Sequence, residues 1–230
     1  SEDNDFIYIG PAANFNLIQN SEIIRKYIPV LIDAVSKIGS HQIRNSGTIG
    51  GNLCTCASCA DSAPILITYN AEVEICSAKG KRIVPLTEIL LHHHRISISK
   101  NEILTKIIVP KPKANFAANF QKFGLRESAS ISVASVAVGL SVEHSIITDA
   151  SIVVGACAPT PKRCPSAINK IINSDIRKIY PDSQLLNEIA EAASSDINPI
   201  DDIRGSAEYR REIVKIITKR AIINALTFFQ

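Results

Sequence analysis

Residues 42–64 read Gln-Ile-Arg-Asn-Ser-Gly-Thr-Ile-Gly-Gly-Asn-Leu-Cys-Thr-Cys-Ala-Ser-Cys-Ala-Asp-Ser-Ala-Pro. Small and polar residues crowd this segment, which lies between two segments of regular pattern. Gly47, Gly50 and Gly51 fall within five positions, although the 230-residue chain has only 10 glycines. Glycine permits positive φ and lets a ligand approach where a Cβ would block it. We therefore expect a glycine loop, which either binds a ligand or forms a tight turn between core elements.

Four polar side chains flank these glycines: the hydroxyls of Thr48 and Thr55, the amide of Asn52 and the carboxylate of Asp61. Together with free backbone N–H groups, they suit an anionic, hydroxyl-rich ligand such as a nucleotide-like cofactor. The amides and Thr48 would face phosphate, and Asp61 would accept from a ribose-like hydroxyl or a ring N–H. The segment matches neither G-x-G-x-x-G nor G-x-x-x-x-G-K-[ST], so the Rossmann and P-loop interpretations lack their residues.

The run from Gln42 to Asn52, with Ala60-Asp-Ser-Ala-Pro64 after it, closely resembles the FAD-binding subunit of the xanthine dehydrogenase family of molybdenum hydroxylases. The second half of the chain continues the resemblance in the family's order. Its landmarks there are Phe120-Gln-Lys-Phe-Gly-Leu-Arg-Glu127, Gly155-Ala-Cys-Ala-Pro-Thr-Pro161 and Arg204-Gly-Ser-Ala-Glu-Tyr-Arg-Arg211. The resemblance thus covers nearly the whole chain.

The resemblance implies an α+β protein of two domains. Residues 1–112 would form the larger, second FAD-binding subdomain of the vanillyl-alcohol-oxidase/xanthine-dehydrogenase type. Residues 113–230 would form an α+β C-terminal domain like that of the carbon monoxide dehydrogenase flavoprotein. The boundary falls at Pro110-Lys-Pro-Lys113, which cannot sustain a helix or a central strand. The family's first subdomain, with its own Gly-Gly-Thr-Asp type loop, has no counterpart here, so we expect a separate chain or a truncation.

The resemblance also assigns cofactor binding to particular residues. They are Gly47, Thr48, Ile49, Gly50, Gly51, Asn52, Thr55, Asp61, Leu104 and Lys122. Thr48, Gly50, Gly51 and Asn52 would hold the FAD pyrophosphate, and Asp61 would contact the cofactor nearby. Leu104 and Lys122 match positions against the flavin and its ribityl chain.

Each of these assignments has a structural alternative. Asp61 could cap the following helix, Leu104 could be core, and Lys122 could be a solvated strand residue. Arg126 and Glu127 would border the nicotinamide entry or form a surface ion pair.

The family's logic implies an electron-transfer subunit with no catalytic side chain of its own. Substrate is hydroxylated at a molybdopterin centre in a large subunit, and electrons reach FAD in this chain through [2Fe–2S] centres in a small subunit. FAD then passes them to NAD⁺ or another acceptor, while the protein supplies position and electrostatics. The alternative is a flavin-free scaffold or assembly subunit of such a complex.

Cys54, Cys56 and Cys59 form a C-x-C-x-x-C motif. Three thiolates could ligate a cluster or zinc, with Cys76 as a conceivable fourth ligand. Most members of the family have small residues here, so we expect small buried thiols and no metal. Consecutive side chains point in different directions, so residues 92–94, three histidines, are expected in a surface turn.

Composition limits the remaining classes. A net charge of +3 without a basic run, and 5% aromatic residues, give no indication of nucleic-acid binding. No apolar run approaches the roughly 20 residues of a membrane helix. The acidic, polar first residues are unlike a signal peptide, so a cytoplasmic protein is the default expectation.

Hydrophobic periodicity and turn residues predict the regular elements. Helices are expected from Glu22 after an Asn20 or Ser21 cap, from Pro29 to a cap at Gly39, and over 184–194 and 207–226. Strands are expected over 6–9, over 71–76 and 82–85 as a hairpin, and over 105–109, 116–123, 130–142 and 146–157.

Overall fold

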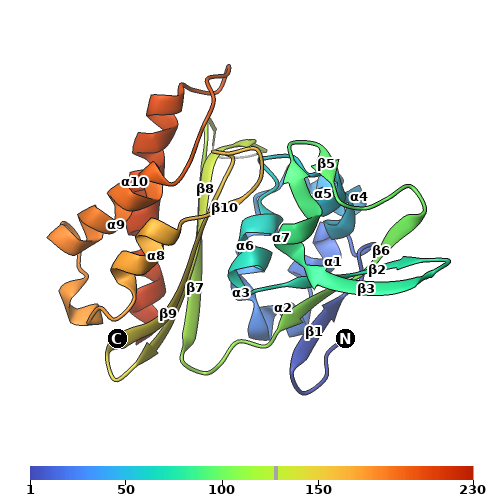
Figure 1. Ribbon diagram of the computed structural model, residues 1–230, viewed down its shortest axis with the longest axis horizontal. Helices are drawn as coiled ribbons and strands as arrows, with labels where there is room; N and C mark the ends of the chain where they lie inside the picture. The colour runs from blue at the N-terminus through green and yellow to red at the C-terminus, as the bar shows by residue number, and fades with distance from the viewer. Residues whose placement is uncertain (127–128, 230) are drawn as a thin grey trace.

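The computed structural model describes residues 1–126 and 129–229. Figure 1 shows two antiparallel four-stranded sheets, each associated with helices, so the α+β class is confirmed. One sheet takes all its strands from residues up to 110, and the other takes its strands from residue 116 onward. Glu127, one of the residues expected at the nicotinamide entry, lies outside the described residues.

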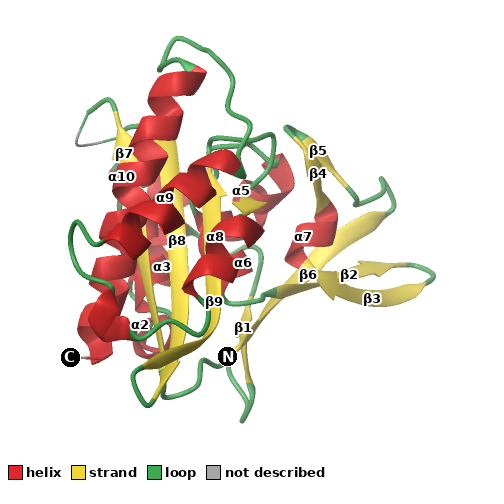
Figure 2. Ribbon diagram, turned by 60° about the vertical axis from the view of Figure 1, so that its left-hand side comes forward, coloured by secondary structure: helices red, strands yellow, loops and turns green. Residues whose placement is uncertain are grey.

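The N-terminal sheet has the order β1-β6-β2-β3. Its strands are β1 (Phe6–Ile9), β2 (Glu72–Ser77), β3 (Gly80–Pro85) and β6 (Glu102–Pro110). The predicted hairpin is confirmed, with β2 and β3 joined by the turn before Gly80. A bulge lies between Glu74 and Ile75 where β2 pairs with β6. Figure 2 shows this hairpin extending away from the rest of the molecule.

Three short helices follow β1: α1 (Phe15–Gln19), α2 (Glu22–Tyr27) and α3 (Pro29–Ser36). Ser21 caps α2 by accepting from the Ile24 N–H, and Pro29 occupies the first turn of α3, as predicted. The C-cap of α3 is Lys37 rather than the predicted Gly39, which has a φ of +52° two residues later.

The segment expected as a glycine loop is mostly helical, and that expectation is wrong. It contains α4 (His41–Ser46), α5 (Ile49–Thr55) and the start of α6 (Ser62–Thr68). Ser40 and Thr48 each accept a hydrogen bond from a first-turn N–H, so they are helix caps. Short helices lie close together in this segment and need many capping residues. Because the residue types that cap helices are also those that favour turns, the segment has the composition of a loop.

The C-terminal sheet has the order β10-β9-β8-β7 and is covered on both faces. Its strands are β7 (Phe116–Gly124), β8 (Ser132–Glu143), β9 (Ile146–Gly155) and β10 (Lys162–Arg163). In Figure 1, β7–β9 stand between α3 and α6 on one side and α8–α10 on the other. Along β8, Ala137 belongs to the core shared with α3 and α6, whereas Val136 and Val138 belong to the core under α10. Successive side chains of one strand point to opposite faces of the sheet and so pack into two different cores.

The remaining elements are short except for the last two helices. They are α7 (Leu86–Ile89), β4 (Leu90–His92), β5 (Arg95–Ile96), α8 (Pro165–Ile171), η1 (Ile176–Lys178), α9 (Gln184–Ser195), α10 (Ala207–Leu226) and η2 (Thr227–Phe229). Helices α9 and α10 match their predictions, and Ser183 and Ser206 cap them. Within the described part of the chain, no helix has the length and apolar character needed to cross a bilayer.

Candidate functional site: the α5–α6 segment and strand β7

Helix α5 begins at the first polar residue of the proposed pyrophosphate site. Thr48 is its N-cap: Oγ1 accepts from the Gly51 N–H (3.0 Å) and its carbonyl accepts from the Asn52 N–H (2.9 Å). A Cβ on Gly51 would lie 2.9 Å from Thr48 Oγ1 and so would crowd this cap. Because Oγ1 acts as an acceptor here, the Thr48 hydroxyl proton remains available to a ligand.

The turn at residues 11–13 accepts hydrogen bonds from the first two N–H groups of α5. Ile49 donates to the Ala13 carbonyl and Gly50 to the Pro11 carbonyl, both at 2.9 Å. A Cβ on Gly50 would lie 2.4 Å from Pro11 Cβ, so this glycine is required by packing against the turn. The expected free N–H groups of residues 49–52 are therefore all engaged internally. Side chains, rather than backbone amides, provide the donors of this segment.

Asn52 is held in one orientation by the start of the next helix. Ser62, which is fully buried in the first turn of α6, donates from Oγ to Asn52 Oδ1 at 2.6 Å. This bond leaves the Nδ2 group of Asn52 as a donor for another acceptor. Thr55 instead turns its hydroxyl back onto the Gly51 carbonyl, at 2.7 Å. Of these two predicted residues, Asn52 is thus the one with a donor to offer.

Asp61 and Lys122 form a buried ion pair across the two halves of the chain. Lys122 Nζ lies 2.8 Å from Asp61 Oδ2, and the side chains are 8% and 3% exposed. Lys122 Nζ also donates to the Lys37 carbonyl at the end of α3 (3.1 Å), and Ser132 Oγ donates to Asp61 Oδ1 (2.6 Å). The alternative of a solvated Lys122 is wrong, because this side chain is buried; Asp61 does occupy the N-cap position of α6, but its side chain makes no cap bond there.

Leu104, expected at the flavin, and Arg126, expected at the nicotinamide entry, make other contacts in the structure. Leu104 is 6% exposed, pairs with Ile75 across the N-terminal sheet and packs in the hydrophobic core there. Arg126 is exposed, and its guanidinium donates to the Ala129 carbonyl at 2.8 Å. Among the described residues, no hydrogen bond or ion pair ties either residue to the Thr48, Asn52 and Asp61 side chains, although Leu104 shares a hydrophobic core with Ile49 and Leu53 of α5.

The cysteine motif meets the histidine turn at the end of α5. Cys56 ends α5 in the left-handed conformation (φ 47°), and its thiol donates to the His92 carbonyl at 3.2 Å. His94 Nδ1 bonds the Thr55 carbonyl at 2.8 Å, so that nitrogen carries the proton. Burial raises the pKa of the Cys54 and Cys56 thiols.

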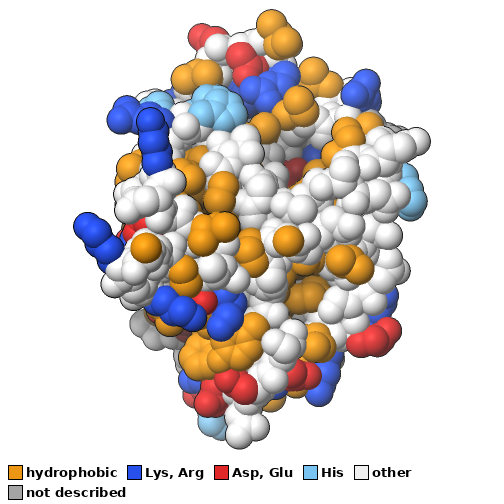
Figure 3. Space-filling view, turned by 90° about the vertical axis from the view of Figure 1, so that its right-hand side faces the viewer, with side chains coloured by type: hydrophobic (Ala, Val, Ile, Leu, Met, Phe, Trp, Pro, Cys, Tyr) orange, Lys and Arg blue, Asp and Glu red, His pale blue; other side chains and the backbone are white. Residues whose placement is uncertain are grey.

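His93 and His94 form the exposed β4–β5 turn, as predicted, whereas His92 is the last residue of β4. Across residues 1–126 and 129–229, no three His, Cys, Asp or Glu side chains are grouped as a metal site requires. Figure 3 shows the face on the right of Figure 1, where the white of backbone and uncharged polar side chains covers most of the surface and cationic side chains are spread around its edge.

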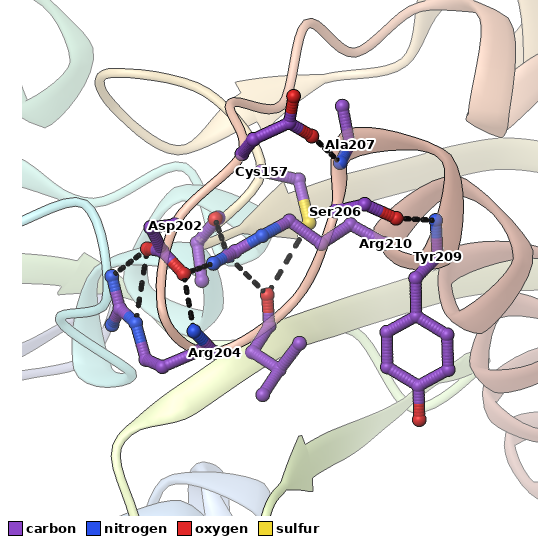
Figure 4. A network of polar contacts seen from close by, with 10 residues as sticks. Cys157, Asp202, Arg204, Ser206, Ala207, Tyr209 and Arg210 are labelled. Carbon is purple, nitrogen blue, oxygen red and sulfur yellow. Dashed lines mark hydrogen bonds and ion pairs between the residues drawn. The ribbon is translucent and has the colours of Figure 1, made fainter.

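Sequence reasoning missed a buried network in the Arg204–Arg211 landmark (Figure 4). Arg210 is 1% exposed; its guanidinium donates to the carbonyls of Val133 (2.8 Å) and Ala156 (3.0 Å) and pairs with Asp202 (2.6 Å). Burial raises the pKa of Asp202, but hydrogen bonds from Arg204 and Arg210 outweigh it and hold that pKa at about 2. The available signal was the pair of aspartates, Asp201 and Asp202, just before a landmark that contains three arginines.

Comparison with known proteins agrees with this geometry. Residues 1–112 match the family described as the FAD binding domain in molybdopterin dehydrogenase, and residues 119–225 match the CO dehydrogenase flavoprotein C-terminal domain. The xanthine dehydrogenase FAD-binding subunit of Escherichia coli O157:H7 is 31% identical over 95% of this chain and 73% of its own length. The nicotine 6-hydroxylase medium subunit of Paenarthrobacter nicotinovorans is 32% identical over 97% of this chain and 76% of its own.

Solved structures agree on the fold. Carbon monoxide dehydrogenase from Hydrogenophaga pseudoflava, in a form lacking the Mo-pyranopterin moiety, superposes with a TM-score of 0.92. It is 24% identical, and the match covers 99% of this chain and 77% of that one. The separate motifs, the family matches and the two relatives point to the same conclusion. The chain belongs to the xanthine dehydrogenase and carbon monoxide dehydrogenase family of molybdenum hydroxylases, as one of its FAD-binding, oxidoreductase flavoprotein subunits.

Proposed function

We propose that this chain holds FAD between α5, α6 and β7, as the electron-transfer subunit of a molybdenum hydroxylase. FAD supplies the redox chemistry, taking electrons from [2Fe–2S] centres in a small partner subunit and passing them to NAD⁺ or another acceptor. Substrate oxidation belongs to a molybdopterin-containing large subunit. We also propose two domains, residues 1–112 and 113–230, that both contribute to the FAD site.

The observation that carries this proposal is the convergence of three separated motifs. Asn52 is bonded to Ser62, and Asp61, the residue before Ser62, is bonded to Lys122. The glycine segment, the Ala60–Pro64 segment and the Phe120–Glu127 landmark therefore meet at one place. The donors they offer, a hydroxyl, an amide and an ammonium, suit phosphate oxygens and the polar edge of a flavin.

Each residue has a task in this proposal. Thr48 and Asn52 donate to the pyrophosphate from side chains fixed by the α5 cap and by Ser62. Gly51 keeps that surface free of a side chain, whereas Gly47, Ile49 and Gly50 shape the backbone beneath it. Lys122, held in place by Asp61, directs its remaining donor to the cofactor. Thr55 and Leu104 stay in the proposal as the more peripheral members.

A visible absorption spectrum of the purified complex tests the proposal. The informative variants are Asn52→Ala, which removes the oriented amide, and Gly51→Val, which covers the proposed surface. Asn198→Ala is the matched control, because Asn198 is exposed and distant in sequence from every motif of the site. We expect flavin bands in the wild type and the control, and weaker bands in both site variants.

Either of two results would count against this assignment. A wild-type complex that carries no flavin would favour the scaffold alternative. Flavin bands that are equally strong in all four proteins would place the cofactor away from α5. The identity of the acceptor is tested separately, by adding NAD⁺ to the substrate-reduced complex and recording reoxidation of the flavin.

A further inference from the structure

Ser132, the first residue of β8, is fully buried and bonded to the ion pair at the proposed flavin site. We propose that Ser132 is a positioning residue, which sets the direction of the Lys122 ammonium through the Asp61 carboxylate. The proposal rests on the proposed function, since it takes Lys122 as a cofactor contact. No motif in the sequence marked Ser132, and 71 residues separate it from Asp61.

The geometry fixes the carboxylate at both of its oxygens. Asp61 Oδ1 accepts from Ser132 at 2.6 Å and Oδ2 accepts from Lys122 at 2.8 Å. A carboxylate held on one side only can rotate about its terminal torsion, which is broad. The hydroxyl of Ser132 removes that freedom, so the oxygen facing Lys122 stays in place.

Lys122 is oriented in turn by two acceptors. Its ammonium has three donors, and the Asp61 carboxylate and the Lys37 carbonyl (3.1 Å) take two of them. Two fixed acceptors leave the third N–H pointing in one direction. Loss of the Ser132 hydroxyl would let the carboxylate turn and the ammonium follow it, so the third donor would lose its direction.

The position of this cation affects the flavin and not only the protein. A cation close to a redox centre favours the reduced form, and at this depth of burial the interaction is less screened than in water. A displaced Lys122 therefore changes the reduction potential of the flavin as well as its affinity. A residue that merely supported packing would change stability and leave the potential unaltered.

The same strand provides a matched control. Ser135 is 1% exposed, and among the described residues its Oγ is one of the few buried polar atoms without a hydrogen-bond partner. Ser135 lies directly opposite Lys122 across the β7–β8 ladder, so Ser135→Ala removes a buried hydroxyl beside the ion pair without removing a hydrogen bond to it. Ser132→Thr keeps the hydroxyl, and Ser132→Cys replaces it with a weak donor of similar size.

The experiment uses the assembled complex with wild-type chain, Ser132→Ala, Ser132→Cys, Ser132→Thr and Ser135→Ala. Flavin content after dialysis, the dissociation constant for added FAD and the midpoint potential from a redox titration are measured for each. We expect Ser132→Ala to bind FAD roughly tenfold more weakly, the effect of one hydrogen bond to a charged group, and to shift the midpoint potential. Ser132→Cys should fall between, and Ser132→Thr and Ser135→Ala should resemble the wild type.

Ser132→Ala and Ser135→Ala with equal affinities and equal potentials would overturn the inference while leaving the proposed function intact. A change in melting temperature alone, with the potential unmoved, would reduce Ser132 to a packing residue and overturn it too. If Ser132→Ala does not assemble, the comparison of Ser132→Cys with the wild type decides by the same readouts. A wild-type complex without flavin would instead refute the proposed function itself.

Discussion

Replacing Arg210 with methionine should cause a large loss of stability, because methionine keeps the apolar volume and removes a fully buried charge. The guanidinium makes three contacts shorter than or equal to 3.0 Å, to the carbonyls of Val133 and Ala156 and to Asp202. Removing one partner from a buried ion pair costs about 3–5 kcal/mol. For a chain of this size, each kcal/mol lowers the melting temperature by roughly 2–4 °C.

Urea unfolding followed by circular dichroism measures this loss, and Arg211→Met is the matched control. Arg211 is the next residue and half-buried, and its side chain lies outside the network of Figure 4. We expect Arg211→Met to change the free energy of unfolding by about 0.5 kcal/mol or less. If Arg210→Met costs less than about 1 kcal/mol, or matches Arg211→Met, the reasoning about the buried network is refuted. A stabilised Arg210→Met protein would show that desolvation of the guanidinium outweighs its contacts.

Three further predictions concern separate features. Asp202 has a folded-state pKa of about 2, below the unfolded value near 4, so the stability that it contributes is complete above about pH 4 and is lost as the pH falls toward 2. Asp202→Asn should therefore lower the free energy of unfolding, measured with urea, more at pH 6 than at pH 3. Equal losses at the two pH values would contradict this. Gly50→Ala should lower stability by about 1–3 kcal/mol in thermal melting, because its Cβ would meet Pro11, whereas Gly10→Ala has open space and should change little. Burial raises the pKa of the Cys164 thiol to about 12, so iodoacetamide at pH 8 should not alkylate Cys164 in the native protein, as checked by mass spectrometry. Alkylation of Cys164 before the protein unfolds would refute this prediction.

The long helices and strands were predictable from sequence because each one repeats its pattern of apolar residues several times. Helix α10 spans 20 residues with a serine cap and buried positions at helical spacing, and its predicted limits are the observed ones. The strands β7–β9 were predicted within a few residues for the same reason. Helices α1, α4 and α5 have five to seven residues, too few for a period to emerge. Helix α8 was missed as well, and it has only seven residues.

For the candidate site, the sequence suggested residues but not the contacts between them. The resemblance named Asp61 and Lys122, and the structure joins them, but nothing local to either residue indicates the other. The pairing depends on β7 lying beside α3, and on β8 and β9 lying beside α6, which is a property of the whole fold. The hydrogen bonds from the Ile49 and Gly50 amides to the turn at residues 11–13 could not be predicted from sequence for the same reason. Sequence patterns indicate which face of a helix or strand is buried and where it ends. A site depends in addition on which helices and strands contact each other.

The arrangement of strands β7–β9 affects how the molecule unfolds. Ala137 and Val153 face the N-terminal helices, whereas Val136 and Val154 face α8–α10, so neighbouring residues of one strand are committed to opposite cores. Loss of either core would expose one whole face of the same strands to water. The proposed domain boundary after residue 112 would thus divide the chain without dividing its cooperativity. Calorimetry should record one melting transition, with the calorimetric and van't Hoff enthalpies equal, even though two families of domain are joined here.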